Sequence, residues 1–271
     1  MRDPGAKRVR SVQCVAVADL LKGKLAVILG VANKWSIAYA IANAFAREGA
    51  DLALSYLSDR EKGQIESLSS GWNVASLFPC DVTKDDDLLR LNETVAALNR
   101  PVHAVVHSLA FAKHEELGNP FVQTSRDGFL LAQNVSAFSL VAVARALAPL
   151  MAEGGSITTL TYIGSTRVVP NYNVMGVAKA SLEASMRYLA SELGPQKIRV
   201  NAISAGPIKT VSARGVKDFS SILEVCAQRA PLRHNTEQAE VADVAVFLAS
   251  DLSRGVAGNL IFVDSGMSVM G

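Results

Sequence analysis

The sequence predicts an α/β fold in which a doubly wound parallel sheet of about seven strands carries helices on both faces. Short apolar runs rich in β-branched residues alternate with longer helical stretches from residue 23 onward. The strand-like runs are apolar throughout, which is typical of strands buried on both faces. With 271 residues, 49% of them hydrophobic, the chain can bury one large core.

The elements follow one another in a regular strand–helix order. Strands are expected at residues 24–30, 51–56, 73–79, 102–107, 156–160, 197–204 and 260–264. Helices are expected at about 36–49, 59–69, 81–99 and 126–151, and a further helix that contains Lys179 extends to about residue 193. Ser36 is a natural N-cap for the first helix. With right-handed crossovers this order describes a Rossmann-type sheet, which binds ligands beyond the carboxyl ends of its strands.

One domain is expected over residues 21–271, preceded by a poorly ordered extension, residues 1–20. The extension places four cationic residues before a short, weakly apolar run, so a targeting role stays open as an alternative. Residues 206–219 form the longest irregular stretch and are expected to be a lid over the substrate, with a loop of no fixed structure as the alternative.

Composition restricts the possible partners. The net charge of +2 and the lack of a Lys/Arg run argue against nucleic acid and membrane surfaces. No run approaches the roughly 18 apolar residues that a membrane-spanning helix needs. Cys14, Cys80 and Cys226 are odd in number and widely spaced, and no metal-ligand spacing is present, so we expect no disulfide framework and no metal site. A reducing, cytoplasmic setting is expected.

The stretch after the fifth predicted strand concentrates chemically useful side chains. Tyr162 and Tyr172 precede Lys179, and Tyr172 and Lys179 are seven positions apart, which returns them to one face of a helix. A phenol, with a pKa near about 10, can donate a proton or hydrogen bond to a carbonyl oxygen that gains negative charge. A lysine nearby can hold a cofactor hydroxyl. Alternatively, both tyrosines are half-buried aromatics and Lys179 is a solvated surface residue.

The turn after the first strand is a candidate phosphate-binding site. Gly30 allows a tight exit from the strand, and the helix that begins at Ser36 presents free amides to an anion. The dinucleotide fingerprint GxGxxG is absent, so the turn alone is weak evidence. After the second strand, Leu57 suits neither an NAD ribose nor an NADP phosphate, while Asp59 favours NADH and Arg60 favours NADPH. We expect NADH, with NADPH less favoured.

Two spaced motifs together resemble a known family. Gly30-x5-Ser36-x-Ala38 and Tyr162-x9-Tyr172-x6-Lys179 resemble the NADH-dependent enoyl-acyl-carrier-protein reductases of bacterial type II fatty-acid synthesis, a divergent branch of the short-chain dehydrogenase/reductase superfamily. The resemblance covers about residues 23–266. The six-residue gap between Tyr172 and Lys179 is specific, because ordinary members of the superfamily use Tyr-x3-Lys. Further matching stretches are Cys80-Asp81-Val82, residues 107–112, residues 170–176 and residues 200–210.

The resemblance implies roles for individual residues. Tyr162, Tyr172 and Lys179 would be catalytic, and Ala112 would contact the acyl thioester together with the two tyrosines. The cofactor would be held by Gly30, Ser36, Ile37, Asp81, Val82, Leu109, Lys179, Ile208, Thr210 and Ser212. For the apolar members of this set the alternative is core packing, in which case only their backbone would serve the cofactor.

The resemblance also implies a reaction and partners. The enzyme would reduce trans-2-enoyl thioesters carried by acyl carrier protein, with NADH, and would assemble as a homotetramer. Leu57 stands where relatives often have glutamine, and Ser220-Ser221 replaces basic residues that relatives often use toward the acidic carrier protein. The alternatives are another short-chain reductase acting on a ketoacyl or small carbonyl substrate, and a nicotinamide-binding regulator without catalysis.

Overall fold

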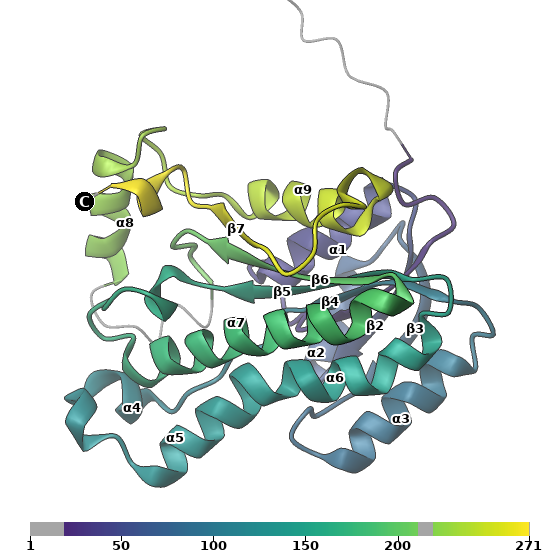
Figure 1. The fold of residues 1–271 in the computed structure, drawn as a ribbon, viewed down its shortest axis with the longest axis horizontal. Coiled ribbons are helices and arrows are strands. Elements are labelled where there is room, and N and C mark those ends of the chain that lie inside the picture. Colours follow the sequence, from purple (N-terminus) through teal and green to yellow (C-terminus); the bar gives the residue numbers. More distant parts are fainter. Residues whose placement is uncertain (1–18, 211–218, 271) are drawn as a thin grey trace, which may run out of the picture.

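The computed structural model describes residues 19–210 and 219–270. Its seven strands form one parallel sheet in the order β3-β2-β1-β4-β5-β6-β7, which confirms the predicted doubly wound fold (Figure 1). The strands are β1 (Leu25–Leu29), β2 (Asp51–Tyr56), β3 (Asn73–Pro79), β4 (Val102–His107), β5 (Gly155–Thr161), β6 (Ile198–Ala205) and β7 (Leu260–Val263). All seven lie within about one or two residues of the predicted runs, because burial on both faces gives each strand a continuous apolar sequence.

Helices cover both faces of the sheet, as Figure 1 shows. They are α1 (Ile37–Arg47), α2 (Asp59–Leu68), α3 (Asp85–Ala96), α4 (His114–Gly118), α5 (Arg126–Gln133), α6 (Ser139–Leu147), α7 (Asn173–Leu193), α8 (Phe219–Arg229) and α9 (Gln238–Ala249). One apolar cluster joins α1 and α9 to one face, and a second joins α3, α6 and α7 to the other. The sequence did not lead us to expect α4, α8 or α9.

Two helices differ from their predicted course for local reasons. The third was expected from residue 81, but α3 begins at Asp85 because the Asp81 carboxylate accepts hydrogen bonds from the Thr83 amide (3.0 Å) and hydroxyl (2.7 Å), which forms a turn. The predicted helix over 126–151 is continuous from Arg126 to Leu150, yet it contains a π-helical turn, η2 (Asn134–Phe138).

That long helical stretch corrects the expectation that no run could span a membrane. By length and composition alone Arg126–Leu150 is apolar enough to do so, and half of its most apolar window is buried inside the protein. The apolar composition has a simple origin, because α6 packs against α3, α7 and β4. A core helix must be apolar over a wide face, so a length-and-hydropathy criterion also selects it.

The topology places the candidate ligand site. β1 lies between β2 and β4, so the chain crosses to the other half of the sheet next to the carboxyl end of β1. Gly30 follows β1 with φ of +102°, and a Cβ there would lie 2.2 Å from the carbonyl oxygen of Ser108. Only glycine therefore lets the turn after β1 approach the segment after β4 this closely.

Candidate active site

The β5–α7 connection brings the two predicted tyrosines together. Tyr162 follows directly after β5, and Tyr172 immediately precedes α7. Their ring centroids lie 5.0 Å apart, with the planes inclined by 70° in an edge-to-face arrangement. Asn171 and Asn173 have φ of 61° and 39°, so the chain turns sharply at this point before it enters the helix. Tyr172 is therefore the N-cap residue of α7, and the helix itself begins one residue later, at Asn173.

Lys179 is not a solvated surface residue. Its side chain lies in the second turn of α7, the residue is 5% exposed, and its Nζ donates a hydrogen bond to the carbonyl oxygen of Leu160 (2.8 Å) in β5. Burial lowers the pKa of Lys179 to about 8, while the carboxylate of Glu183 opposes this shift. An ammonium with this pKa remains charged at neutral pH but is poised to titrate.

Both phenols are held in the neutral form. Burial raises the pKa of Tyr162 to about 12, and burial, together with electrostatic interaction with Tyr162 and Glu183, raises the pKa of Tyr172 further. Neutral phenols at neutral pH are hydrogen-bond donors. The pair can therefore stabilise negative charge that develops on a substrate oxygen.

His107 is a buried core residue whose two ring nitrogens both have hydrogen-bond partners. It is fully buried at the end of β4, where Nδ1 lies 2.9 Å from Thr159 Oγ1 and Nε2 lies 2.8 Å from Ser139 Oγ. Burial, with a contribution from the charge of Lys179, lowers the pKa of His107 to about 3. A neutral imidazole held at both nitrogens serves the structure here.

The candidate phosphate turn has the expected helix start. The Ser36 hydroxyl accepts a hydrogen bond from the Tyr39 amide (3.2 Å) and donates one to the Asn33 carbonyl (2.8 Å), which makes it the N-cap of α1. Ile37 is half-buried. Because it is the first residue of α1, its amide lies at the positive end of the helix. This end of α1 can bind a pyrophosphate through backbone donors.

The remaining predicted cofactor residues, and the predicted substrate contact Ala112, follow β3, β4 and β6. Val82 is buried and Asp81 half-buried after β3, while Leu109 and Ala112 are half-buried after β4. Ile208 is buried after β6, and the Thr210 amide donates to its carbonyl (2.8 Å). These segments all leave the carboxyl edge of the sheet, whereas Ser212 lies outside the described residues.

Sequence reasoning missed two polar residues of this region. The Glu183 carboxylate is buried one helical turn after Lys179 and accepts a hydrogen bond from the Thr161 hydroxyl (2.7 Å). Ser136, in the π-helical turn, accepts a hydrogen bond from the Phe111 amide (3.0 Å) and so fixes the segment that contains Ala112. The i, i+4 spacing of Lys179 and Glu183 was the available signal for the first residue.

The region after β2 carries a fixed negative charge. Glu61 Oε2 accepts a hydrogen bond from the Leu57 amide (2.7 Å), and the Ser58 hydroxyl accepts one from the Glu61 amide (3.4 Å) as N-cap of α2. Leu57 itself is 64% exposed. The carboxylate of Glu61, not the side chain of Leu57, is therefore the polar group fixed at the end of β2.

The described residues include free thiols but no metal-binding group of side chains. Within residues 19–210 and 219–270 no group of three or more His, Cys, Asp or Glu side chains could hold a metal ion. Cys80 and Cys226 are buried free thiols.

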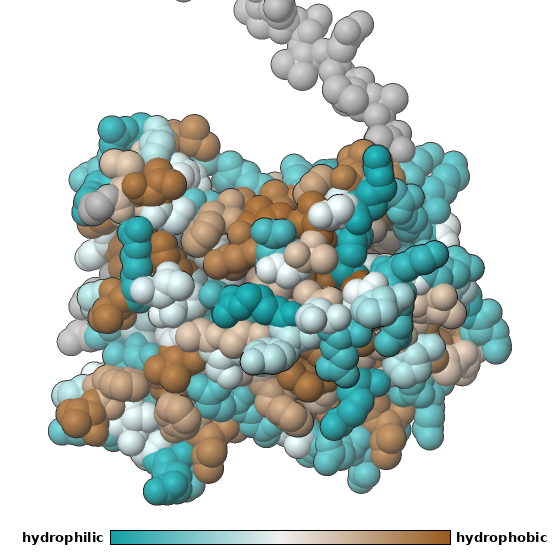
Figure 2. Space-filling view, in the orientation of Figure 1, coloured by the Kyte–Doolittle hydropathy of each residue, from teal (hydrophilic) through white to brown (hydrophobic). Residues whose placement is uncertain are grey.

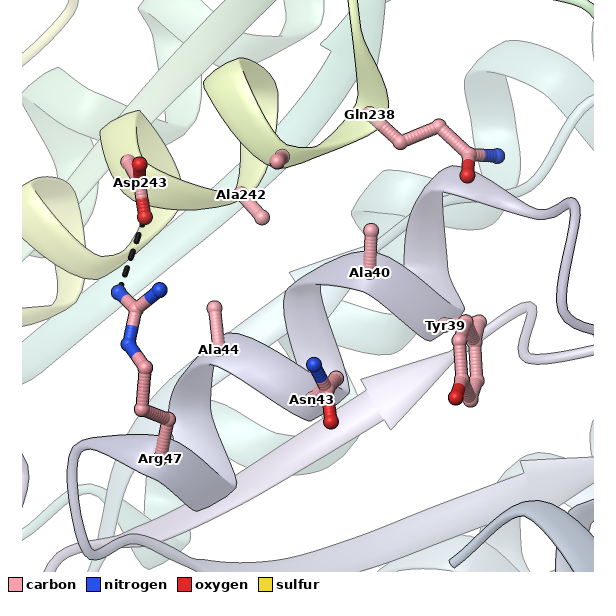
Figure 3. Close-up of a pocket in the computed structure, with 9 residues that line it drawn as sticks. Tyr39, Ala40, Asn43, Ala44, Arg47, Gln238, Ala242 and Asp243 are labelled. Atoms are coloured by element: carbon pink, nitrogen blue, oxygen red, sulfur yellow. Dashed lines mark hydrogen bonds and ion pairs between the residues drawn. The ribbon is translucent and has the colours of Figure 1, made fainter.

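Figure 3 shows a surface groove between α1 and α9, in which the Arg47 guanidinium forms an ion pair with the Asp243 carboxylate at 2.9 Å. None of the predicted site residues lines this groove.

Comparison with known proteins identifies the family of the chain. A family model described as enoyl-(acyl carrier protein) reductase matches residues 30–268. A Bacillus cereus protein named enoyl-[acyl-carrier-protein] reductase [NADH] FabI is 54% identical over 255 residues, which are 93% of this chain and 100% of that protein. A Staphylococcus aureus relative named as the NADPH enzyme is 49% identical, over 91% of this chain and 97% of its own length.

Solved structures agree as well. The crystal structure of the Bacillus cereus enoyl-acyl carrier protein reductase with NADP+ and indole naphthyridinone superposes with a TM-score of 0.91, at 55% identity, over 93% of this chain and 99% of that one. The fold, the tyrosine pair and the buried lysine thus occur in a chain that is similar to these reductases over almost its whole length. This chain belongs to the enoyl-(acyl carrier protein) reductase family of oxidoreductases.

Proposed function

We propose that this chain reduces trans-2-enoyl thioesters bound to acyl carrier protein to saturated acyl thioesters, with NADH, in fatty-acid elongation. The observation that carries the proposal is the buried pair of neutral phenols beside a buried lysine, in a chain of this family. The six-residue gap between Tyr172 and Lys179 argues against an ordinary short-chain reductase of ketoacyl or small carbonyl substrates.

The proposed mechanism assigns each residue a separate task. The cofactor, when bound, supplies the hydride that is added to the β-carbon of the substrate. Negative charge then collects on the thioester oxygen, to which Tyr172 donates a hydrogen bond, and protonation of the α-carbon completes the saturated acyl thioester. Tyr162 packs edge-on against Tyr172 and assists in the same site. Lys179 would bond the nicotinamide ribose, and Ala112 would contact the acyl thioester.

The proposed cofactor site follows the carboxyl edge of the sheet. Gly30, Ser36 and Ile37 would hold the pyrophosphate and the nearby ribose at the start of α1, and Asp81 and Val82 would flank the adenine. Leu109 would line the path between the riboses. Ile208, Thr210 and Ser212 would hold the carboxamide and phosphates.

NADH is the proposed cofactor in preference to NADPH. The relatives divide on this point, since a Bacillus cereus relative is named for NADH and a Staphylococcus aureus relative for NADPH. In this chain Glu61 is fixed at the end of β2 by the Leu57 amide, and Asp59 lies in the first turn of the same helix. Two carboxylates beside the adenosine ribose disfavour an additional phosphate there.

The proposal extends to partners, location and chain organisation. We expect a homotetramer, acting in the cytoplasm and binding no nucleic acid and no membrane. Large apolar side chains are exposed on α5 to α7 and around β7, including Leu130, Tyr188 and Phe262. Figure 2 shows apolar side chains gathered over the region where Figure 1 places β7. Residues 21–271 are proposed to be one domain and residues 1–20 an extension.

An absorbance assay of NADH oxidation tests the function. A 2-enoyl thioester and a 3-ketoacyl thioester are compared in parallel, each with NADH and with NADPH. Rapid oxidation with the enoyl substrate alone is expected. Turnover restricted to the ketoacyl substrate would replace the proposal with an ordinary short-chain reductase, and nucleotide binding without turnover would replace it with a regulator.

A further inference from the structure

Two ionisable side chains of α7 are buried against the end of β5. Lys179 is 5% exposed and Glu183, one helical turn later, is 4% exposed. They bond consecutive residues of β5: Lys179 donates to the Leu160 carbonyl (2.8 Å), and Glu183 accepts from the Thr161 hydroxyl (2.7 Å). Tyr162 is the next residue along the chain. The two side chains therefore join the start of α7 to the end of the strand that presents Tyr162.

A hydrogen bond to a threonine does not by itself explain a buried carboxylate. Removing a carboxylate from water costs several kcal/mol in proteins, and apolar residues of similar volume commonly stabilise a core as well or better. A buried ammonium has the same cost and needs an opposite charge nearby to stay protonated. Placing both charges one turn apart on one helix reduces both costs, because each group lowers the penalty for the other.

The other titratable groups around Lys179 do not supply that charge. His107, on β4, is neutral near pH 7, because its pKa is lowered to about 3 by burial and by Lys179 itself. Tyr162 and Tyr172, before and at the start of α7, are neutral phenols with raised pKa values. Glu183 raises the pKa of Lys179 against the effect of burial. Among the described residues, it is the group whose charge supports the ammonium.

We propose that Glu183 is a positioning residue for the reductase reaction: its buried carboxylate keeps Lys179 an ammonium and fixes Thr161, and through them it maintains the cofactor-ribose contact beside Tyr162. The inference rests on the proposed function, in which Lys179 bonds the ribose. Glu183 itself touches neither substrate nor cofactor in this assignment.

The test is direct NADH binding, measured by fluorescence between pH 6 and pH 9.5, for wild type and three variants. Glu183→Gln removes the charge and keeps an oxygen that can accept from Thr161. Thr161→Val removes the hydroxyl and keeps the charge. Glu192→Gln removes an exposed carboxylate from the same helix and is the matched control.

The proposed effect of the Glu183 charge on Lys179 predicts a specific pH dependence of NADH binding. In wild type, NADH binding weakens as pH rises through the pKa of Lys179, about 8. In Glu183→Gln the midpoint of this loss moves to lower pH. If it moves by about one pH unit, NADH binding at any pH above both midpoints becomes about tenfold weaker than in wild type. Thr161→Val and Glu192→Gln keep the wild-type midpoint. A Glu183→Gln curve that superposes on that of Glu192→Gln would overturn the proposal.

A double variant separates charge coupling from packing. In Lys179→Met/Glu183→Gln, the second substitution should change NADH affinity no further than Lys179→Met alone, because Glu183 acts through Lys179. If Glu183→Gln does not fold, recovery of folding in the double variant supports the proposal, since the unpaired ammonium is then the cause. Failure of the double variant to fold as well would overturn it.

The readout also separates this inference from the proposed function. Wild type that binds NADH but does not reduce an enoyl thioester would contradict the proposed function. The pH dependence of NADH binding would then still test the effect of Glu183 on Lys179. Wild type that reduces the enoyl thioester, with binding in Glu183→Gln equal to the control at every pH, would remove only the role of Glu183.

Discussion

The ring of Tyr172 occupies the space beside Gly164 that a side chain would otherwise fill. A Cβ built on Gly164 would lie 2.5 Å from Tyr172 Cδ1 and 3.4 Å from Tyr162 Cδ1. Gly164 lies in the short 3₁₀ turn η4 (Ile163–Ser165) that follows Tyr162, so one glycine borders both rings. The edge-to-face geometry of the pair depends on the absence of a side chain at this position.

Gly164→Ala should therefore lower turnover on an enoyl thioester by at least about tenfold, because the new methyl group displaces the Tyr172 ring and misplaced catalytic groups lose rate steeply. NADH affinity, measured by fluorescence, should change little. Gly63→Ala is the matched control: Gly63 lies in α2 with open space where its Cβ would be. That variant should keep full activity and gain up to about 1 kcal/mol in free energy of unfolding.

Tyr172→Phe should lower kcat by about 10²–10³-fold, the usual cost of removing one donor to a developing oxyanion. NADH affinity should stay within about twofold of wild type, since the assigned partner of this phenol is the substrate oxygen. Steady-state kinetics and direct binding measure the two effects separately. Tyr162→Phe should have the smaller effect on kcat, and unchanged kcat in Tyr172→Phe would remove the assignment.

Glu61→Gln should increase the NADPH/NADH ratio of kcat/KM by about fivefold, which corresponds to about 1 kcal/mol of repulsion removed at a partly exposed site. The neutral amide still offers an oxygen to the Leu57 amide, so the end of β2 keeps its shape. Glu66→Gln, on an exposed face of the same helix, is the control and should leave the ratio unchanged. Equal ratios in the two variants would show that cofactor choice is made elsewhere.

His107 should make the fold sensitive to acid. Its folded-state pKa of about 3 lies below the ordinary value of 6.5, so between these values the unfolded chain binds a proton that the folded chain does not. The stability contribution is present above pH 6.5 and is lost as pH falls, by up to about 1.4 kcal/mol per pH unit.

Urea unfolding at pH 7.5 and pH 5.5 checks this slope. His107→Gln should be less stable at pH 7.5 but should lose less stability on acidification than wild type. His114→Gln, an exposed substitution at the start of α4, should keep the wild-type slope. An identical slope in His107→Gln and wild type would assign the acid sensitivity to other groups.

The strands and the two tyrosines could be predicted because their signals are local. An apolar run buried on both faces is visible in the sequence, and Tyr162, Tyr172 and Lys179 lie within a single strand–turn–helix segment. The start of α3 could not be predicted, because it depends on which backbone donors the Asp81 side chain reaches. The burial of Glu183 was equally hidden, since it depends on the packing of α7 against β5 and β6.

The position of β5 in the sheet has a consequence for how this protein can change. β5 is hydrogen-bonded on both sides, to β4 and β6, and the segment that carries both tyrosines continues directly from it. The proposed reacting groups are thus attached to a central strand, the kind of element that opens last in local unfolding. Change is accordingly easier in exposed segments, such as the 3₁₀ turn η1 (Phe121–Gln123), where Val122 is 90% exposed, than in the segment that carries the two tyrosines.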